Sequence, residues 1–175
     1  MDFKKLANQY RDELLDNVLP FWLEHSQDLE FGGYFTCLDR KGGVFDTDKF
    51  IWLQGREVWM FSMLYNKVEK RQEWLDCAVQ GGEFLKKYGH DGNYNWYFSL
   101  DRSGRPLVEP YNIFSYTFAT MAFGQLSLAT GSQEYADIAK KTFEIILSKV
   151  DNPKGKWNKL HPDTRNLKNF ALPMI

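Results

Sequence analysis

The chain is poor in the residues that mark several classes of protein. Its 175 residues include two cysteines and three histidines, and 22 basic residues almost balance 23 acidic ones. Cys37 and Cys77 lack disulfide-framework or metal-site spacing, which favours a reducing, cytoplasmic setting. The even charge argues against nucleic acid or an acidic membrane as the main partner. The apolar stretches are shorter than a membrane span, and the first residues lack the apolar core of a secretory signal.

Aromatic side chains, by contrast, are abundant. Phe, Tyr and Trp make up 17% of the chain, and apolar residues as a whole make up 43%. That apolar share is ordinary for a globular protein, and the length suits one domain rather than two. Aromatic rings mostly fill cores, but they also line sugar and cofactor pockets.

Helical periodicity recurs along the chain and alternates between two kinds of helix. Residues 3–24, 72–88 and 133–150 carry apolar side chains on one face, which predicts amphipathic helices. Residues 51–68 and 112–129 leave almost no polar face, which predicts buried helices. The apolar face of the first helix comprises Phe3, Leu6, Tyr10, Leu14, Val18 and Trp22.

The segments between these helices predict short β-hairpins and contain an internal repeat. Residues 30–50 and 93–108 share a Leu-Asp-Arg-x-Gly motif, offset by 62 positions, and Asp163 lies a further 62 residues on. Turn chemistry explains the recurring aspartates best. We expect Tyr34-Phe35 and Tyr97-Phe98 to occupy equivalent positions. A repeat of outer helix, hairpin and inner helix predicts an all-α toroid with an outer ring of amphipathic helices around a buried ring.

The end of the chain suggests that the ring is larger than this sequence. Met174-Ile175 stops an apolar run about one turn into a helix, without a cap or a glycine. We therefore expect residues 1–175 to be the N-terminal part of a single barrel domain whose C-terminal part is absent.

The densest polar and aromatic cluster runs from Asp46 to Trp59. Within it, Arg56 falls on the first turns of an otherwise apolar helix, where an unpaired buried charge would be expensive. It either forms a structural ion pair, for instance with Glu57, or anchors a substrate in the central cavity. The residues alone leave both hypotheses open. Of the tryptophans that could stack on a sugar, Trp59 suits the core, and Trp52 and Trp96 are expected to be more open.

Other polar residues are weaker candidates. A glycosidase needs two carboxylates across the scissile bond. Candidates for such a pair are Glu57, Asp48, Glu109 and Asp101, although caps and turns explain acidic residues of this kind more simply. The three histidines lie in predicted loops or at helix ends, without metal-ligand spacing: His25, His90 and His161.

Several segments resemble the N-acylglucosamine 2-epimerase family. The resemblance is carried by Gly32-Gly-Tyr-Phe-Thr-Cys-Leu-Asp-Arg40, Asp46-Thr-Asp-Lys-Phe50, Trp52-Leu-Gln-Gly-Arg56-Glu-Val-Trp59, Ile113-Phe-Ser115 and Ala171-Leu-Pro-Met-Ile175. It covers nearly the whole chain and implies an (α/α)6 barrel, which agrees with the toroid predicted from the repeat.

The resemblance also implies an activity. The family interconverts N-acetylglucosamine and N-acetylmannosamine by removing and returning the proton at C2, with histidines as acid and base. It implies no cofactor for the chemistry, ATP or another nucleotide as a possible activator, and a homodimer. Arg56 matches the family's substrate-contacting arginine. Trp52, and more weakly Phe114 and Ser115, are expected to complete the substrate-binding site.

The family's two catalytic histidines lie downstream of the Leu-Pro-Met-Ile stretch, so none of the histidines here takes their place. We expect this chain to carry the substrate anchor without the acid and base, and to be inactive alone. Two alternatives stay open: part of an α/α-toroid glycosidase or lyase, and a non-catalytic interaction module. The Trp-Leu-Gln-Gly-Arg match favours the epimerase.

Overall fold

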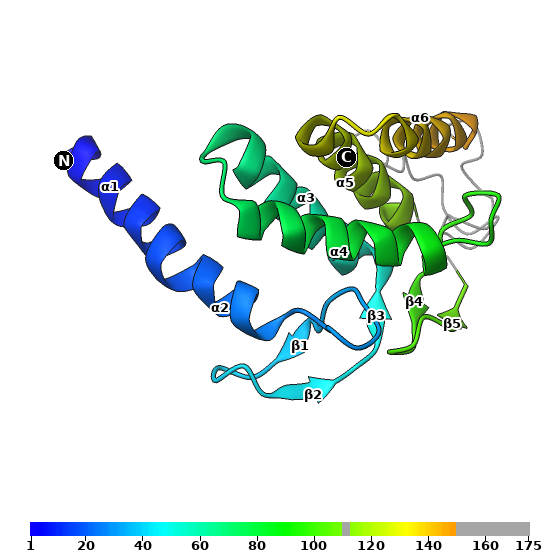
Figure 1. The fold of residues 1–175 in the computed structure, drawn as a ribbon, viewed down its shortest axis with the longest axis horizontal. Helices are drawn as coiled ribbons and strands as arrows, with labels where there is room; N and C mark the ends of the chain where they lie inside the picture. Colours follow the sequence, from blue (N-terminus) through cyan, green and yellow to red (C-terminus); the bar gives the residue numbers. More distant parts are fainter. Residues whose placement is uncertain (110–112, 150–175) are drawn as a thin grey trace, which may run out of the picture.

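Helices dominate the computed structural model, which describes residues 1–109 and 113–149 (Figure 1). The helices are α1 (Phe3–Glu13), the π-helical turn η1 (Leu14–Val18), α2 (Leu19–His25), α3 (Ile51–Lys67), α4 (Gln72–Tyr88), α5 (Phe114–Thr130) and α6 (Gln133–Ser148). The short strands are β1 (Cys37–Leu38), β2 (Val44–Asp46), β3 (Lys49–Phe50), β4 (Ser99–Leu100) and β5 (Pro106–Val108). No described helix has the length and apolar character needed to cross a membrane.

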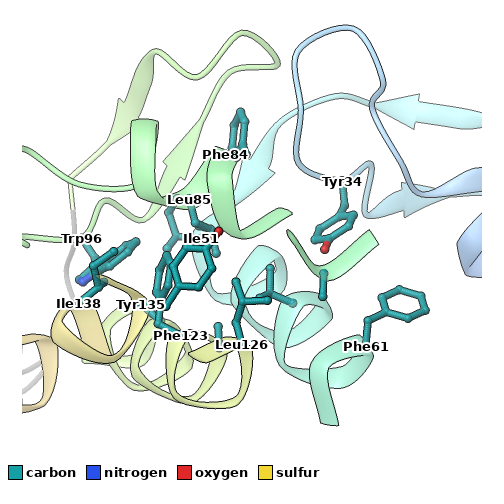
Figure 2. Close-up of a cluster of buried hydrophobic side chains, with 14 of the residues drawn as sticks. Tyr34, Ile51, Phe61, Phe84, Leu85, Trp96, Phe123, Leu126, Tyr135 and Ile138 are labelled. Atoms are coloured by element: carbon teal, nitrogen blue, oxygen red, sulfur yellow. The ribbon is translucent and has the colours of Figure 1, made fainter. Parts of the chain in front are cut away.

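The two apolar helices form an inner pair, and the amphipathic helices cover them. Helices α3 and α5 pack along each other, while α4 packs on α3 and α6 packs on α5. Side chains from all four helices meet in one core (Figure 2), and its largest members include Phe61, Leu85, Phe123 and Tyr135. Full burial of such a side chain contributes about 1.5–3 kcal/mol. The predicted alternation of inner and outer helices is confirmed for these four.

The hairpin segments link the two repeat units through a shared sheet. Strands β1 and β2 form an antiparallel pair, and the second sheet has the order β3-β4-β5. Lys49 pairs with Leu100 and Phe50 pairs with Ser99, so a strand of the first unit is bonded to a strand of the second. Because β3 leads directly into α3, this pairing fixes where the inner helix begins.

The two Leu-Asp-Arg turns have the same hydrogen bonding. The Oδ1 atom of Asp39 accepts from the Gly43 amide at 2.9 Å, and that of Asp101 accepts from the Arg105 amide at 2.9 Å. Both turns contain a glycine in the left-handed region, Gly42 (φ 84°) and Gly104 (φ 94°). The prediction that turn chemistry explains these aspartates is confirmed.

The expected equivalence of Tyr34-Phe35 with Tyr97-Phe98 is wrong by one residue. Each hairpin is preceded by a single antiparallel bridge, and these bridges place Tyr34 and Trp96 at corresponding positions. Both rings are fully buried, and each donates to an outer helix. Tyr34 Oη donates to the Cys77 carbonyl at 2.8 Å, and Trp96 Nε1 donates to Thr142 Oγ1 at 3.1 Å. Trp96 is therefore a core residue and not the open stacking surface that the sequence suggested.

The first helical segment differs from its prediction in what it buries. The helix forms as expected, but no residue of α1 is buried, and Phe3 and Tyr10 are 75% and 69% exposed. In Figure 1, α1 (blue) extends away from the helical layers. An amphipathic pattern shows which face a helix offers, whereas burial requires a neighbouring surface. The predictions for His161, Asp163 and residues 171–175 fall outside the described residues.

A buried cluster of charges joins the two units. Asp28, which follows α2, and Lys49 of β3 are both almost fully buried, with Lys49 Nζ 2.9 Å from Asp28 Oδ2. Arg102, in the second Leu-Asp-Arg turn, donates two hydrogen bonds to the same carboxylate, from Nε to Oδ2 at 2.9 Å and from Nη2 to Oδ1 at 3.1 Å. Paired bonds of this kind are among the strongest in proteins. We call these three residues the Asp28 cluster.

Hydrogen bonds stabilise the charged form of Asp28 by more than burial destabilises it. Burial by itself would raise the pKa of Asp28, but the bonds from Arg102 and Lys49 outweigh it and lower that pKa from 3.8 to about 2. Lys49 also donates to the Arg102 carbonyl at 2.9 Å and lies over the Phe84 ring, 4.5 Å from its centroid. The carboxylate thus supplies the counter-charge for Lys49, whose side chain is fully buried.

Replacing Asp28 with asparagine is expected to destabilise the fold by about 3–5 kcal/mol, because it leaves Lys49 buried without a counter-charge. Urea unfolding followed by circular dichroism measures the change. Asp12→Asn is the matched control, since the Arg11–Asp12 pair is exposed and such pairs contribute about 0–1 kcal/mol. Equal loss in the two variants would contradict the role of the cluster.

The Asp28 cluster also predicts that the free energy of unfolding decreases in acid. The folded-state pKa of Asp28 lies below its ordinary value. Its contribution to the free energy of unfolding is therefore present above pH 3.8 and lost as the pH falls toward 2.

Candidate functional site

Arg56 lies in the second turn of α3 and is exposed on the side away from the outer helices. Its guanidinium carbon is 5.0 Å from the centroid of the Phe118 ring and 5.5 Å from that of Trp52. Within the described residues it makes no ion pair and no hydrogen bond to another side chain. The structural ion pair that the sequence left open is therefore not observed there, and the Arg56 side chain is exposed to solvent.

The inner helices lie close together beside Arg56. A Cβ atom on Gly55 would lie 3.0 Å from both the carbonyl carbon and the carbonyl oxygen of Phe118. Those are backbone atoms that cannot rotate away, so a larger residue would push α5 from α3. Glycine at this position places the Phe118 ring next to the guanidinium.

The other predicted site residues divide between two faces. Trp52 is half-buried, one turn before Arg56, and its ring lies 6.2 Å from that of Phe118. Phe114 is also half-buried and precedes Phe118 by one turn, which puts the two on the same face of α5. Ser115 is only 1% exposed, and its hydroxyl has no hydrogen-bond partner in the described residues.

A substrate contact through Ser115 is therefore not supported by this structure. Successive helical residues point about 100° apart, so Phe114 and Ser115 cannot share one face. The structure brings together Trp52, Arg56 and Phe118, and Phe114 lies one turn before Phe118 on α5, so these four are the candidate site residues. Phe118 was not predicted as a site residue from the sequence. Its spacing from Phe114 was a signal, but only the packing of α5 on α3 shows that it reaches Arg56.

Glu57 follows Arg56 in α3 and points about 100° away from it around the helix, toward the hairpin and the outer helix. It is 7% exposed, its Oε1 atom has no hydrogen-bond partner among the described residues, and the Ser26 hydroxyl is beside its carboxyl group. Burial raises the pKa of Glu57 from 4.5 to about 8. Tyr34 and Cys77, which belong to the hairpin and the outer helix, are also close enough to interact with it. At neutral pH this side chain is a buried, mostly protonated acid.

Residues 1–109 and 113–149 do not assemble the carboxylate pair of a glycosidase. Glu57 is the sole acidic residue in the sequences of α3 and α5, and it faces the outer layer. Asp101 is used in its turn, where its Oδ2 atom is 2.6 Å from Arg105 Nε. Asp48 and Glu109 lie in the hairpin segments, outside the inner helices.

Each of the two described histidines, His25 and His90, packs against an aromatic ring. The His25 ring ends α2 against Phe21, with centroids 4.9 Å apart. His90 follows α4, stacks on Tyr94 at 4.7 Å and accepts from the Gly92 amide at 3.0 Å, while burial lowers its pKa. These contacts involve none of the four site residues. In the described part of the chain, no histidine is therefore placed as acid or base beside Arg56.

An inner pair of helices covered by an outer pair, with an exposed arginine on one inner helix, is the layered arrangement of an α/α toroid. A family model for N-acylglucosamine 2-epimerase matches residues 33–171. The chain belongs to the N-acylglucosamine 2-epimerase family.

Curated relatives agree over most of this chain. It is 42% identical to the N-acylglucosamine 2-epimerase of Bos taurus over 166 residues, which cover 92% of this chain and 39% of the relative. The Mus musculus enzyme of the same name is 44% identical over 169 residues, covering 94% and 40%. The chain thus spans about two fifths of the length of the curated relatives it matches.

Solved structures confirm the toroid fold. The cellobiose 2-epimerase of Bacillus thermoamylovorans matches with a TM-score of 0.76 and 29% identity, covering 83% of this chain and 37% of that one. A sugar epimerase from a ruminal bacterium matches with a TM-score of 0.78 and 27% identity, covering 95% and 44%. The predicted α/α-barrel class with short hairpins between helices is confirmed.

Glu57→Gln is expected to stabilise the protein increasingly as the pH rises from 4.5 to 8. The raised folded-state pKa makes the wild-type contribution complete below pH 4.5 and lost as the pH rises through 8. Over this range the free energy of unfolding of the wild type falls by up to about 1.4 kcal/mol per pH unit, and Glu57→Gln removes this dependence. Urea unfolding at several pH values measures this, with the exposed Glu144→Gln as control. Parallel pH profiles for wild type and Glu57→Gln would show that the acid is not buried.

Proposed function

We propose that this chain provides the substrate anchor of a sugar 2-epimerase that interconverts N-acetylglucosamine and N-acetylmannosamine. The observation that carries the proposal is the Arg56 guanidinium, whose donors are open on the inner face of a chain from this family. The N-acyl substrate is supported by the relatives of that name at 42–44% identity, whereas the cellobiose 2-epimerase of Dictyoglomus turgidum is 29% identical.

The chemistry suits an arginine. Removing the C2 proton of a ring-opened sugar leaves negative charge on the neighbouring oxygen, as in an enediolate. A guanidinium presents several fixed N–H donors to such an oxygen, and it remains charged at every working pH. Preorganised donors of this kind stabilise a developing anion by several kcal/mol. The rings of Trp52 and Phe114 offer apolar surface for the faces of the sugar.

The glycosidase alternative requires two carboxylates around the ligand, and the described inner helices do not supply them. The interaction-module alternative predicts no sugar binding. Deuterium incorporation at C2 of N-acetylglucosamine in D2O separates the epimerase from a glycosidase, because a glycosidase does not label that carbon. Activation by ATP or another nucleotide, a homodimer and a cytoplasmic location stay predictions of the family resemblance.

In a protein that spans the full length of the relatives, Arg56→Ala is expected to lower kcat/KM for this interconversion by roughly 100-fold or more, with little change in melting temperature. Arg56→Lys should not restore the rate, since an ammonium lacks the planar fork. Coupled measurement of N-acetylmannosamine and of C2 deuterium gives the rate. Arg105→Ala is the control, because that side chain is 84% exposed in a turn. Near-normal turnover in the Arg56 variants would remove Arg56 from the site.

The 175-residue chain by itself is expected to bind N-acetylglucosamine without epimerising it. Epimerisation needs a base on one face of C2 and a proton donor on the other. The described histidines are engaged elsewhere, at the end of α2 and after α4. An NMR titration measures binding, and C2 deuterium reports turnover in the same sample. Measurable turnover would return the acid and base to residues of this chain.

A further inference from the structure

We propose that Phe118 is a positioning residue for Arg56. Its ring and that of Trp52 hold the guanidinium by its flat face and leave the N–H edge free for sugar oxygens. The identity of the sugar rests on the proposed function, whereas the positioning of Arg56 does not.

The first support is the geometry of the three groups. The guanidinium carbon lies 5.0 Å from Phe118 and 5.5 Å from Trp52, within the distance at which a cation is attracted to an aromatic face. The two rings are 6.2 Å apart and inclined by 47° to each other. Because Trp52 belongs to α3 and Phe118 to α5, the cation is fixed relative to both inner helices.

The second support is the contrast with another arginine. Arg102 also lies over an aromatic ring, 5.0 Å from Phe31, but its N–H groups are used by Asp28 at 2.9 and 3.1 Å and by Glu30 at 2.9 Å. Arg56 has no carboxylate partner in the described residues. A carboxylate would orient the guanidinium but would also occupy the edge that a ligand needs. Two rings orient it without occupying that edge.

The third support is the close contact that fixes Phe118 itself. Gly55 precedes Arg56 and lies against the backbone of Phe118, so the chain positions of ring and cation are set together. Phe118 is also half-buried, unlike the fully buried Phe123 on the same helix. A phenylalanine that served only the core would have no reason to face the arginine.

The arginine side chain provides a direct test in the 175-residue chain. Ring currents should displace the Nε–Hε resonance of Arg56 upfield, and Phe118→Leu should move it part of the way toward the value of a free arginine, since the Trp52 ring remains. Phe118→Tyr keeps the ring and should keep the displacement. Phe143→Leu, on the exposed face of α6, is the control. An unchanged Arg56 resonance in Phe118→Leu would overturn the proposal.

A double-mutant cycle tests the consequence for ligand binding. Phe118→Leu should raise the Kd for N-acetylglucosamine by about threefold to tenfold, Phe118→Tyr should restore it, and Phe118→Leu should have no further effect in an Arg56→Ala background. A purely structural Phe118 would weaken binding equally in both backgrounds, and that result would overturn the proposal. Absence of sugar binding by the wild type would count against the proposed function, while the Arg56 resonance would still decide the positioning.

Discussion

The connection between the two repeat units depends on one buried carboxylate. Asp28 binds Lys49 and Arg102, which come from the strand that leads into α3 and from the turn of the second hairpin. Since Lys49 is two residues before the start of α3, the Asp28 cluster fixes the beginning of the inner helix. The position of Arg56, five residues into that helix, follows from it. A buried ion pair of this kind often adds little net stability, but losing one partner leaves an uncompensated charge, so the arrangement is specific.

The helix that begins there separates two polar residues with opposite requirements. Arg56 and Glu57 are neighbours in the sequence, yet the turn of the helix directs one to the open inner face and the other to the outer layer. The arginine is exposed to solvent and lies next to two aromatic rings. The glutamate keeps its proton because burial disfavours the anion. The two neighbours therefore form no ion pair, and the guanidinium stays available to a ligand.

Family membership and site geometry answer different parts of the question of function. The relatives identify the family, over about two fifths of their length. The geometry of the described residues shows a guanidinium next to two aromatic rings, without a carboxylate pair beside it. An anchor on one inner helix and a base elsewhere around a ring are compatible, because in a toroid the inner helices all face one central space.

Much of this protein was determined by its sequence alone. The alternation of amphipathic and apolar helices and the Leu-Asp-Arg turns follow from local patterns, since periodicity and turn chemistry act over a few residues. The residue pattern drew attention to Arg56, and the family resemblance proposed its role. Tertiary structure alone decided the rest. Trp96 is buried because it meets Thr142, Ser115 is buried because α5 turns it inward, and the stripe on α1 stays exposed in the described structure. Phe118 reaches Arg56 because Gly55 admits the backbone of α5. Those outcomes depend on which surfaces from distant parts of the chain meet. A pattern within a few residues does not show which surfaces those are.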